Sequence, residues 1–216
     1  STARPIRRDR VALAHAGVDA ISPYYDSMIA KLIVWGADRE QALARLDAAL
    51  AATHIVGLHT NVAFLRRVTA SPSFANADLD TALIERERAL LFNAAPLPLE
   101  VAAAGVVAHA LASERSLEGS DPWSRRDGWR LHGSAARRFD IEAQGVHHVF
   151  SLERGTRGAG QTLVLAAQRW PFAAATRADG RHDVTLGDRR WTLQVYATGE
   201  RFSVFAPEGS AVVDEF

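Results

Sequence analysis

The chain has 216 residues, 48% of them hydrophobic and 23% charged, and its 25 basic and 25 acidic residues give a formal net charge of zero. This length allows one large domain or two small ones. The neutral balance gives no reason to expect nucleic acid or an anionic membrane as a partner. There is no cysteine, which excludes disulfides, thiolate catalysis and cysteine-based metal sites and is compatible with a reducing compartment.

Methionine and lysine each occur once, as Met28 and Lys31. Because no methionine opens the chain, we expect a piece of a longer or processed product. No apolar stretch reaches membrane-spanning length and no secretory signal opens the sequence.

The first 92 residues predict short strands alternating with amphipathic helices. A short strand is expected near residues 10–13, and the apolar run at 28–35 predicts a buried strand. Asp38 with Gln41 three residues later is a capping-box signature. The helix it opens has an apolar face made of Ala42, Leu43, Leu46, Ala49 and Leu50.

Further elements follow before the first break in character. Residues 53–58 predict a second short strand, and Thr60 or Asn61 is expected to cap a helix. The apolar face of that helix includes Val62, Leu65 and Val68, and the Ser-Pro-Ser at 71–73 ends it. A last amphipathic helix is predicted over 79–92, with the charged run at 85–88 exposed to solvent.

Two prolines within residues 93–98 predict a boundary between one domain over 1–92 and a second over 93–216. The second domain opens with a segment, 100–113, that is apolar on every side, with only His109 clearly polar in its middle. A helix of this kind has to be buried on all sides.

The rest of the chain predicts the structure that surrounds this helix. Short alternating segments separated by turn residues are expected to form antiparallel strands, and a run of hairpins can close into a barrel without exposed edges. We therefore predict an α+β protein whose second domain is an antiparallel β-barrel around one long apolar helix. The predicted strands are 129–133, 138–143, 147–153, 162–168, 172–178, 182–186, 190–196, 201–205 and 211–213.

Catalytic and metal-binding patterns are weak. The glycine-rich loop at 155–160 has strands on both sides and no lysine nearby, which favours a hairpin tip over a phosphate cradle. His147 and His148 are neighbours in a strand, so they point to opposite faces and do not readily share a metal. No serine lies in a nucleophile-elbow sequence and no acidic cluster offers Mg²⁺ ligands. We predict no catalytic, cofactor-binding or metal-binding residue in this chain.

Trp123 lies in a polar loop together with Arg125 and Arg126. Two interpretations stay open: the indole folds back onto the barrel, or it anchors an interface, because tryptophan and arginine are enriched at binding hot spots.

Residues 22–33, Ser-Pro-Tyr-Tyr-Asp-Ser-Met-Ile-Ala-Lys-Leu-Ile, are followed by Asp-Arg-Glu-Gln-Ala at 38–42 and Gly-Leu-His-Thr-Asn at 57–61. This order resembles the C-terminal end of the biotin carboxylase domain of biotin-dependent carboxylases over residues 10–92. The resemblance implies the last part of an ATP-grasp domain, a structural subdomain that closes its core and helps form its dimer contact. The motif residues are Arg10, Tyr24, Tyr25, Asp26, Lys31 and Asn61.

Within that family the segment 54–61, the Asp-Pro-Trp-Ser at 121–124 and the Phe-Ala-Pro-Glu-Gly-Ser at 205–210 are most similar to alpha subunits of methylcrotonyl-CoA carboxylase. The resemblance implies a subunit-docking (BT) domain, a helix in a barrel, with the carboxyltransferase beta subunit, other alpha subunits and the biotin carrier domain as partners. It also implies a parent ligase of leucine catabolism that uses biotin, ATP, Mg²⁺ and bicarbonate, and we expect a cytoplasmic, bacterial protein. The ATP-grasp catalytic segments and the Ala-Met-Lys-Met biotinylation site are missing, so no catalytic residue carries over.

Two alternatives to this function remain open. The parent enzyme could be a geranyl-CoA or another acyl-CoA carboxylase, or the barrel could be a free-standing protein that binds an apolar ligand. The second alternative requires an empty barrel interior, whereas the apolar helix predicts a filled one.

Overall fold

The computed structural model describes residues 12–13, 29–92, 96–117, 135–155 and 160–216. The chain divides into two compact units, Ser1–Ala94 and Ala95–Phe216, and each is described by itself. The strand predicted at 129–133 lies outside the described residues.

The first unit is mainly helical. Its two short strands, β1 (Ala12–Leu13) and β2 (Leu32–Ile33), pair antiparallel. The helices that follow are α1 (Arg39–Ala51), α2 (Val62–Ala70), α3 (Pro72–Ala75), α4 (Leu83–Arg86) and α5 (Arg88–Phe92).

The capping box predicted at the start of α1 is present. The carboxylate of Asp38 accepts a hydrogen bond from the backbone N–H of Gln41 at 2.7 Å, and the Gln41 side chain accepts one from the N–H of Ala37 at 3.0 Å. Ser71 ends α2 and caps α3, whose first residue is Pro72. The predicted stop at 71–73 is therefore confirmed, and it also starts a new helix.

The buried strand predicted at 28–35 is wrong for most of its length. Within the described residues 29–35, Leu32 and Ile33 alone pair, and Ile33 and Trp35 keep 42% and 41% of their surface exposed. The ladder between β1 and β2 is two residues long, and an isolated two-stranded ladder buries little side-chain surface. The Trp35 carbonyl instead accepts a hydrogen bond from the guanidinium of Arg45 in α1.

The strand predicted at 53–58 is also wrong, since this segment forms no strand. Thr53, the first residue of this segment, bonds to the end of α1 instead. Its backbone N–H donates to the Leu50 carbonyl, and its hydroxyl donates to the Ala49 carbonyl. Gly57 then turns the chain with a φ of +86°, which glycine adopts readily. A local helix end thus overrides the strand preference of the isoleucine and valine.

The helix predicted at 79–92 begins later and divides into α4 and α5 at Glu87. Asp80 is not helical; its carboxylate accepts the N–H of Ala82, and this local bond competes with a helical start. The apolar face proposed for α2 is also partly wrong, because Leu65 is 37% exposed.

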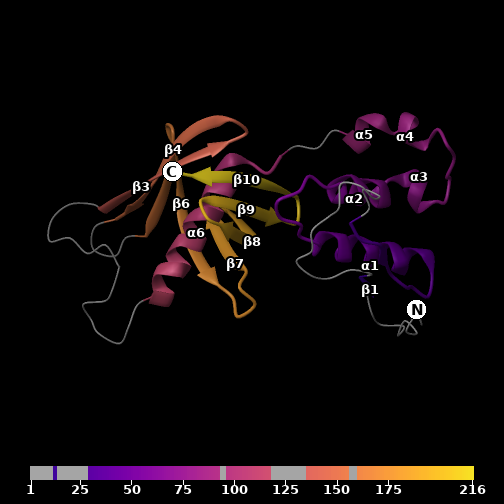
Figure 1. The fold of residues 1–216 in the computed structure, drawn as a ribbon, viewed down its shortest axis with the longest axis horizontal. Coiled ribbons are helices and arrows are strands. Elements are labelled where there is room, and N and C mark those ends of the chain that lie inside the picture. Colours follow the sequence, from indigo (N-terminus) through magenta and orange to yellow (C-terminus); the bar gives the residue numbers. More distant parts are fainter. Residues whose placement is uncertain (1–11, 14–28, 93–95, 118–134, 156–159) are drawn as a thin grey trace. The chain divides into compact units, whose positions relative to one another are not determined.

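The second unit is a helix inside a closed barrel, as predicted. Among the described residues eight antiparallel strands close in the order β10-β3-β4-β5-β6-β7-β8-β9, and Figure 1 shows α6 (Leu99–Leu117) running among them. The strands are β3 (Ala135–Ala143), β4 (Val146–Arg154), β5 (Gln161–Leu165), β6 (Gln168–Thr176), β7 (His182–Leu186), β8 (Arg189–Thr198), β9 (Arg201–Ala206) and β10 (Gly209–Glu215).

Closure follows from the hairpin turns. β4 and β5 pair on either side of the glycine-rich loop, so the hairpin interpretation of residues 155–160 is confirmed by the strands that flank it. Gly145 and Gly187, each with a positive φ, turn β3 into β4 and β7 into β8. The last strand, β10, pairs with β3 and leaves no open edge in the ladder.

The interior of the barrel is filled by the helix. Residues 101–108 of α6 are all buried, which requires neighbours on every side. All of these residues are alanine, glycine or valine, so the backbone of the helix can approach the strands closely. The facing side chains include Phe139, Leu163, Phe172, Trp191 and Leu193. Beyond Leu111 the helix becomes exposed, and Leu117 retains 68% of its surface.

Candidate functional site

Two arrangements of charged side chains stand out in the described part of the chain. One lies in the first unit, between α3 and α5, and the other covers the outer wall of the barrel.

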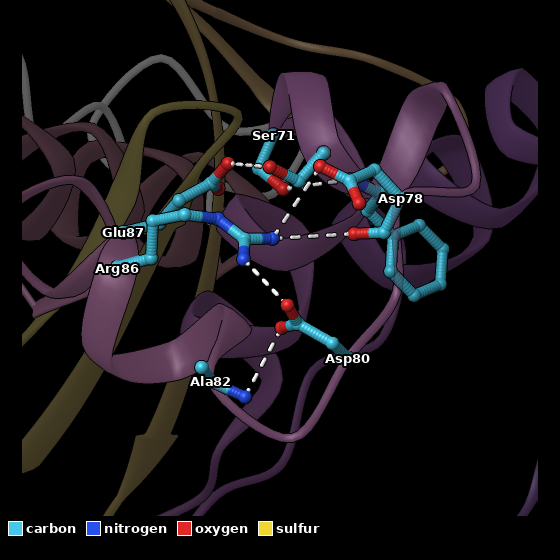
Figure 2. Close-up of polar contacts among 8 residues, drawn as sticks. Ser71, Asp78, Asp80, Ala82, Arg86 and Glu87 are labelled. Atoms are coloured by element: carbon cyan, nitrogen blue, oxygen red, sulfur yellow. Dashed lines mark hydrogen bonds and ion pairs between the residues drawn. The ribbon is translucent and has the colours of Figure 1, made fainter.

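The arrangement in the first unit centres on Arg86 and Glu87 (Figure 2). The guanidinium of Arg86 donates to the Asp80 carboxylate at 2.7 Å and to the backbone carbonyl of Asp78 at 3.4 Å. These contacts lower the pKa of Asp80, through the hydrogen bond from Arg86 first, and raise the pKa of Arg86. The ion pair therefore fixes the loop before α4.

Glu87 contradicts the expectation that the whole charged run is exposed. Its Oε1 accepts a hydrogen bond from the Ser73 hydroxyl, and its Oε2 is buried without a hydrogen-bond partner among the described residues. The hydrogen bond from Ser73 lowers the pKa of Glu87. Glu87 thus links the break between α4 and α5 to the start of α3, which is a structural role.

The outer wall of the barrel carries ion pairs between arginine and aspartate. Arg177 bonds Asp183 and Arg201 bonds Asp214, each at 2.7 Å. The arginines are exposed and the aspartates are half-buried at the surface, where such pairs contribute little to stability. Because alternate residues of a strand point outward and can pair across strands, the sequence pattern could have indicated these ion pairs.

His147 and His148 do lie on opposite faces of β4. His147 approaches the Asp140 carboxylate, with 3.5 Å between Nε2 and Oδ1, whereas His148 stands opposite buried Ile141. Among the residues that the structure describes, no three histidine, aspartate or glutamate side chains gather closely enough to hold a metal ion.

Most of the residues singled out from the sequence lie outside the described ranges. These are the partner-contact candidates Trp123, Arg125 and Arg126 and the motif residues Arg10, Tyr24, Tyr25 and Asp26. Of the other two motif residues, Lys31 is exposed just before β2, and Asn61 precedes α2 without a side-chain capping bond.

A contact that sequence reasoning missed joins His109 of α6 to His182 of β7 inside the second unit. The sequence signal was present, because His109 interrupts an otherwise apolar helix. Its partner could not be chosen among the strands without knowledge of the barrel register.

Comparison with known families matches both units. Residues 4–86 match the biotin carboxylase C-terminal domain, and residues 97–216 match the family described as methylcrotonyl-CoA carboxylase, alpha-subunit, BT domain. The first match defines the class, the biotin-dependent carboxylases. The chain belongs to the methylcrotonyl-CoA carboxylase alpha-subunit family, since the second match covers more than half of its residues.

Curated relatives agree with this assignment. The chain is 39% identical over 158 residues to the mitochondrial methylcrotonoyl-CoA carboxylase subunit alpha of Dictyostelium discoideum, covering 71% of this chain and 23% of that protein. It is 30% identical over 214 residues to the Arabidopsis thaliana subunit, covering 90% and 27%. A biotin carboxylase from Nostoc is 43% identical over 65 residues, covering 30% and 14%. The chain thus spans about a quarter of the alpha subunits that it matches.

These comparisons test two of the expectations drawn from the sequence. The assignment to the end of a biotin carboxylase domain followed by a BT domain is confirmed. The expectation of a bacterial, cytoplasmic protein is wrong, because the similar alpha subunits from Dictyostelium, Arabidopsis, soybean and rice are all described as mitochondrial. The absence of cysteine, which is compatible with any reducing compartment, could not distinguish these locations.

Among the described helices, none is both long and apolar enough to cross a membrane.

Proposed function

We propose that this chain serves subunit assembly in a biotin-dependent acyl-CoA carboxylase, and that its barrel holds the alpha subunit to a carboxyltransferase beta subunit. The observation that carries the proposal is the filled barrel of the second unit, whose residues 97–216 match the BT domain family. A barrel with a solid core offers its outer wall and its loops for contact, not its interior.

The parent enzyme, on this proposal, is the biotin-carboxylating alpha subunit of a methylcrotonyl-CoA carboxylase in leucine degradation. It would carboxylate biotin with ATP, Mg²⁺ and bicarbonate and pass the carboxyl group to the beta subunit, which carboxylates the acyl-CoA. Among the described residues, no three histidine, aspartate or glutamate side chains lie close enough together to hold a metal ion. We propose no catalytic step for this chain.

Other partners follow from the same proposal. Other alpha subunits would contact the biotin carboxylase part, and the biotin carrier domain would belong to the same parent chain. A geranyl-CoA or another acyl-CoA carboxylase remains the alternative within this class, and turnover of the full complex with several acyl-CoAs would identify the substrate.

A lumen for an apolar ligand has little support. Phe139, Phe150 and Leu163 are at most 2% exposed and belong to the same core cluster as Val106 and Val107 of α6. A ligand would have to displace the helix, which would expose this apolar surface to water.

The test is co-purification of the tagged chain with the beta subunit of the same enzyme. We expect the beta subunit to be retained, and Trp123→Ala to weaken its retention if the indole is an interface anchor. Glu40→Ala, at an exposed position of α1 in the first unit, is a control for a general surface change. Failure of the folded chain to retain the beta subunit would overturn the docking role, whereas full retention by the Trp123 variant would remove only the anchor.

A further inference from the structure

Two histidines meet where α6 packs against the barrel wall. His109 lies in the middle of α6 and His182 is the first residue of β7. Their ring centroids are 5.8 Å apart and the planes are perpendicular, so the edge of one ring faces the other. His182 is only 3% exposed, and His109 is half-buried.

The surroundings of this pair suit neutral rings better than charged ones. The Phe202 ring of β9 lies 5.8 Å from His109, and His182 stands opposite buried Leu193 of β8. The polar neighbour is the hydroxyl of Thr176 in β6, 3.1 Å from Nδ1 of His182. An imidazolium has two N–H donors and a charge, and no carboxylate among the described residues bonds to either ring.

Charged groups on the elements around the pair are directed elsewhere. Asp183, next to His182, alternates to the outer face of β7 and bonds Arg177. On α6 itself, Glu114 pairs with Arg137 of β3. Among the described residues, the other titratable or charged groups in the inward rows include Arg189, over the ring of Trp191 in β8, and Glu215, opposite Ile141 at the end of β10. His148 and Arg154 lie in the row of Phe150 on β4.

Burial lowers the pKa of both histidines. For His182 the positive charge that His109 carries when protonated lowers it further. Both rings are therefore neutral near pH 7, and each proton added to one makes the next less favourable.

We propose that the contact between His109 and His182 is an acid-sensitive junction that holds α6 against β7 near neutral pH and loosens on acidification. A histidine that is harder to protonate when folded stabilises the folded state above its unfolded pKa of about 6.5. That stability is lost as the pH falls, because unfolded chains then bind more protons than folded ones. The loosening begins at α6 and β7, since both protons are added between these two elements.

The first measurement is an NMR titration of the imidazole Cε1–H groups of the whole chain between pH 8 and 5. We expect His109 and His182 to titrate below the model-peptide value of about 6.5. The proposal is overturned if both titrate at or above that value. This measurement needs no substitution, so it stands even if a variant fails to fold.

The second measurement is hydrogen exchange of the α6 backbone amides, expressed as protection factors at each pH. In the unaltered chain, protection should fall by up to about tenfold per pH unit for each imidazole below pH 6.5. His109→Gln and His182→Gln should each remove part of this slope, because glutamine stays neutral. His148→Gln, on β4, is the matched control and should keep the full slope. Equal slopes in all four proteins would refute the junction.

Discussion

Gly105 of α6 faces Val204 of β9 so closely that a Cβ atom added at Gly105 would lie 2.9 Å from Cγ1 of Val204 and 3.3 Å from Cδ1 of Leu193. Both neighbours are fully buried. Only a residue without a side chain fits this point of contact between the helix and the barrel. The close approach explains why a glycine stands in the middle of a long helix, where it otherwise weakens helical structure.

Gly105→Ala should therefore destabilise the second unit. Overpacking costs about 1–3 kcal/mol, whereas the better helix propensity of alanine recovers about 1 kcal/mol. We expect a net loss of up to about 2 kcal/mol in the free energy of unfolding, measured by urea denaturation. Ser113→Ala, at an exposed position of α6, controls for propensity and should change stability by less than about 0.5 kcal/mol. A gain in stability for the Gly105 variant would contradict the tight fit.

The pair Phe139 and Phe150 predicts a larger effect. These rings stack across β3 and β4, 4.9 Å apart and nearly parallel, and both are buried. Phe150→Ala should lower the free energy of unfolding by about 3–5 kcal/mol, because it leaves a cavity beside Phe139. Val149→Ala, the neighbouring residue on the outer face, should change it by less than about 0.5 kcal/mol. Similar losses for the two variants, measured by circular dichroism in urea, would argue against the inward direction of Phe150.

Helix capping in the first unit offers a matched comparison. Asp38 makes a side-chain capping bond to α1, whereas Asn61 makes none to α2. Asp38→Ala should cost about 1 kcal/mol, and Asn61→Ala should cost clearly less. Thermal unfolding followed at 222 nm measures both variants. If the two substitutions had the same effect, the capping bond of Asp38 would not be the cause.

Glu87 predicts a pH dependence of the first unit. Its pKa is lowered by the hydrogen bond from Ser73, so its contribution to stability is present above the unfolded value of 4.5 and is lost as the pH falls through the folded one. Glu87→Gln should flatten the loss of stability below pH 4.5, measured by urea unfolding at several pH values. Glu85→Gln, at an exposed position, should leave that loss unchanged. A Glu87 variant as acid-sensitive as the unaltered chain would be inconsistent with this role.

Elements with a strong hydrophobic pattern could be predicted without the structure. The segment 101–108 is apolar on all sides, and such a helix has few folded solutions other than complete enclosure. Turn residues such as Gly145 and Gly187 divide the second half into hairpins, because they adopt a positive φ at little cost. Together these features predicted a helix inside a barrel.

Elements that depend on local competition were predicted poorly. The segment 53–58 has strand propensity, yet the end of α1 takes up Thr53 and no strand pairs with it. The segment 79–92 has a continuous amphipathic pattern, yet it does not form one helix. The Asp80 carboxylate accepts the backbone N–H of Ala82, and Glu87 accepts the hydroxyl of Ser73 from another helix. Side-chain bonds of this kind depend on which segments are near, which a one-dimensional pattern does not contain.

The contact between His109 and His182 likewise depends on which segments lie near each other, which the sequence pattern does not contain. Composition and hydrophobic periodicity alone determined that the second domain is a barrel filled by one apolar helix, since burial of apolar side chains follows from their spacing. The motif around Lys31 identified the family. Which histidine meets His109, and why position 105 accepts only glycine, was decided by the strand register and by the close approach of α6 to β9. Those are properties of packed side chains, and they exist only once distant segments share one interior.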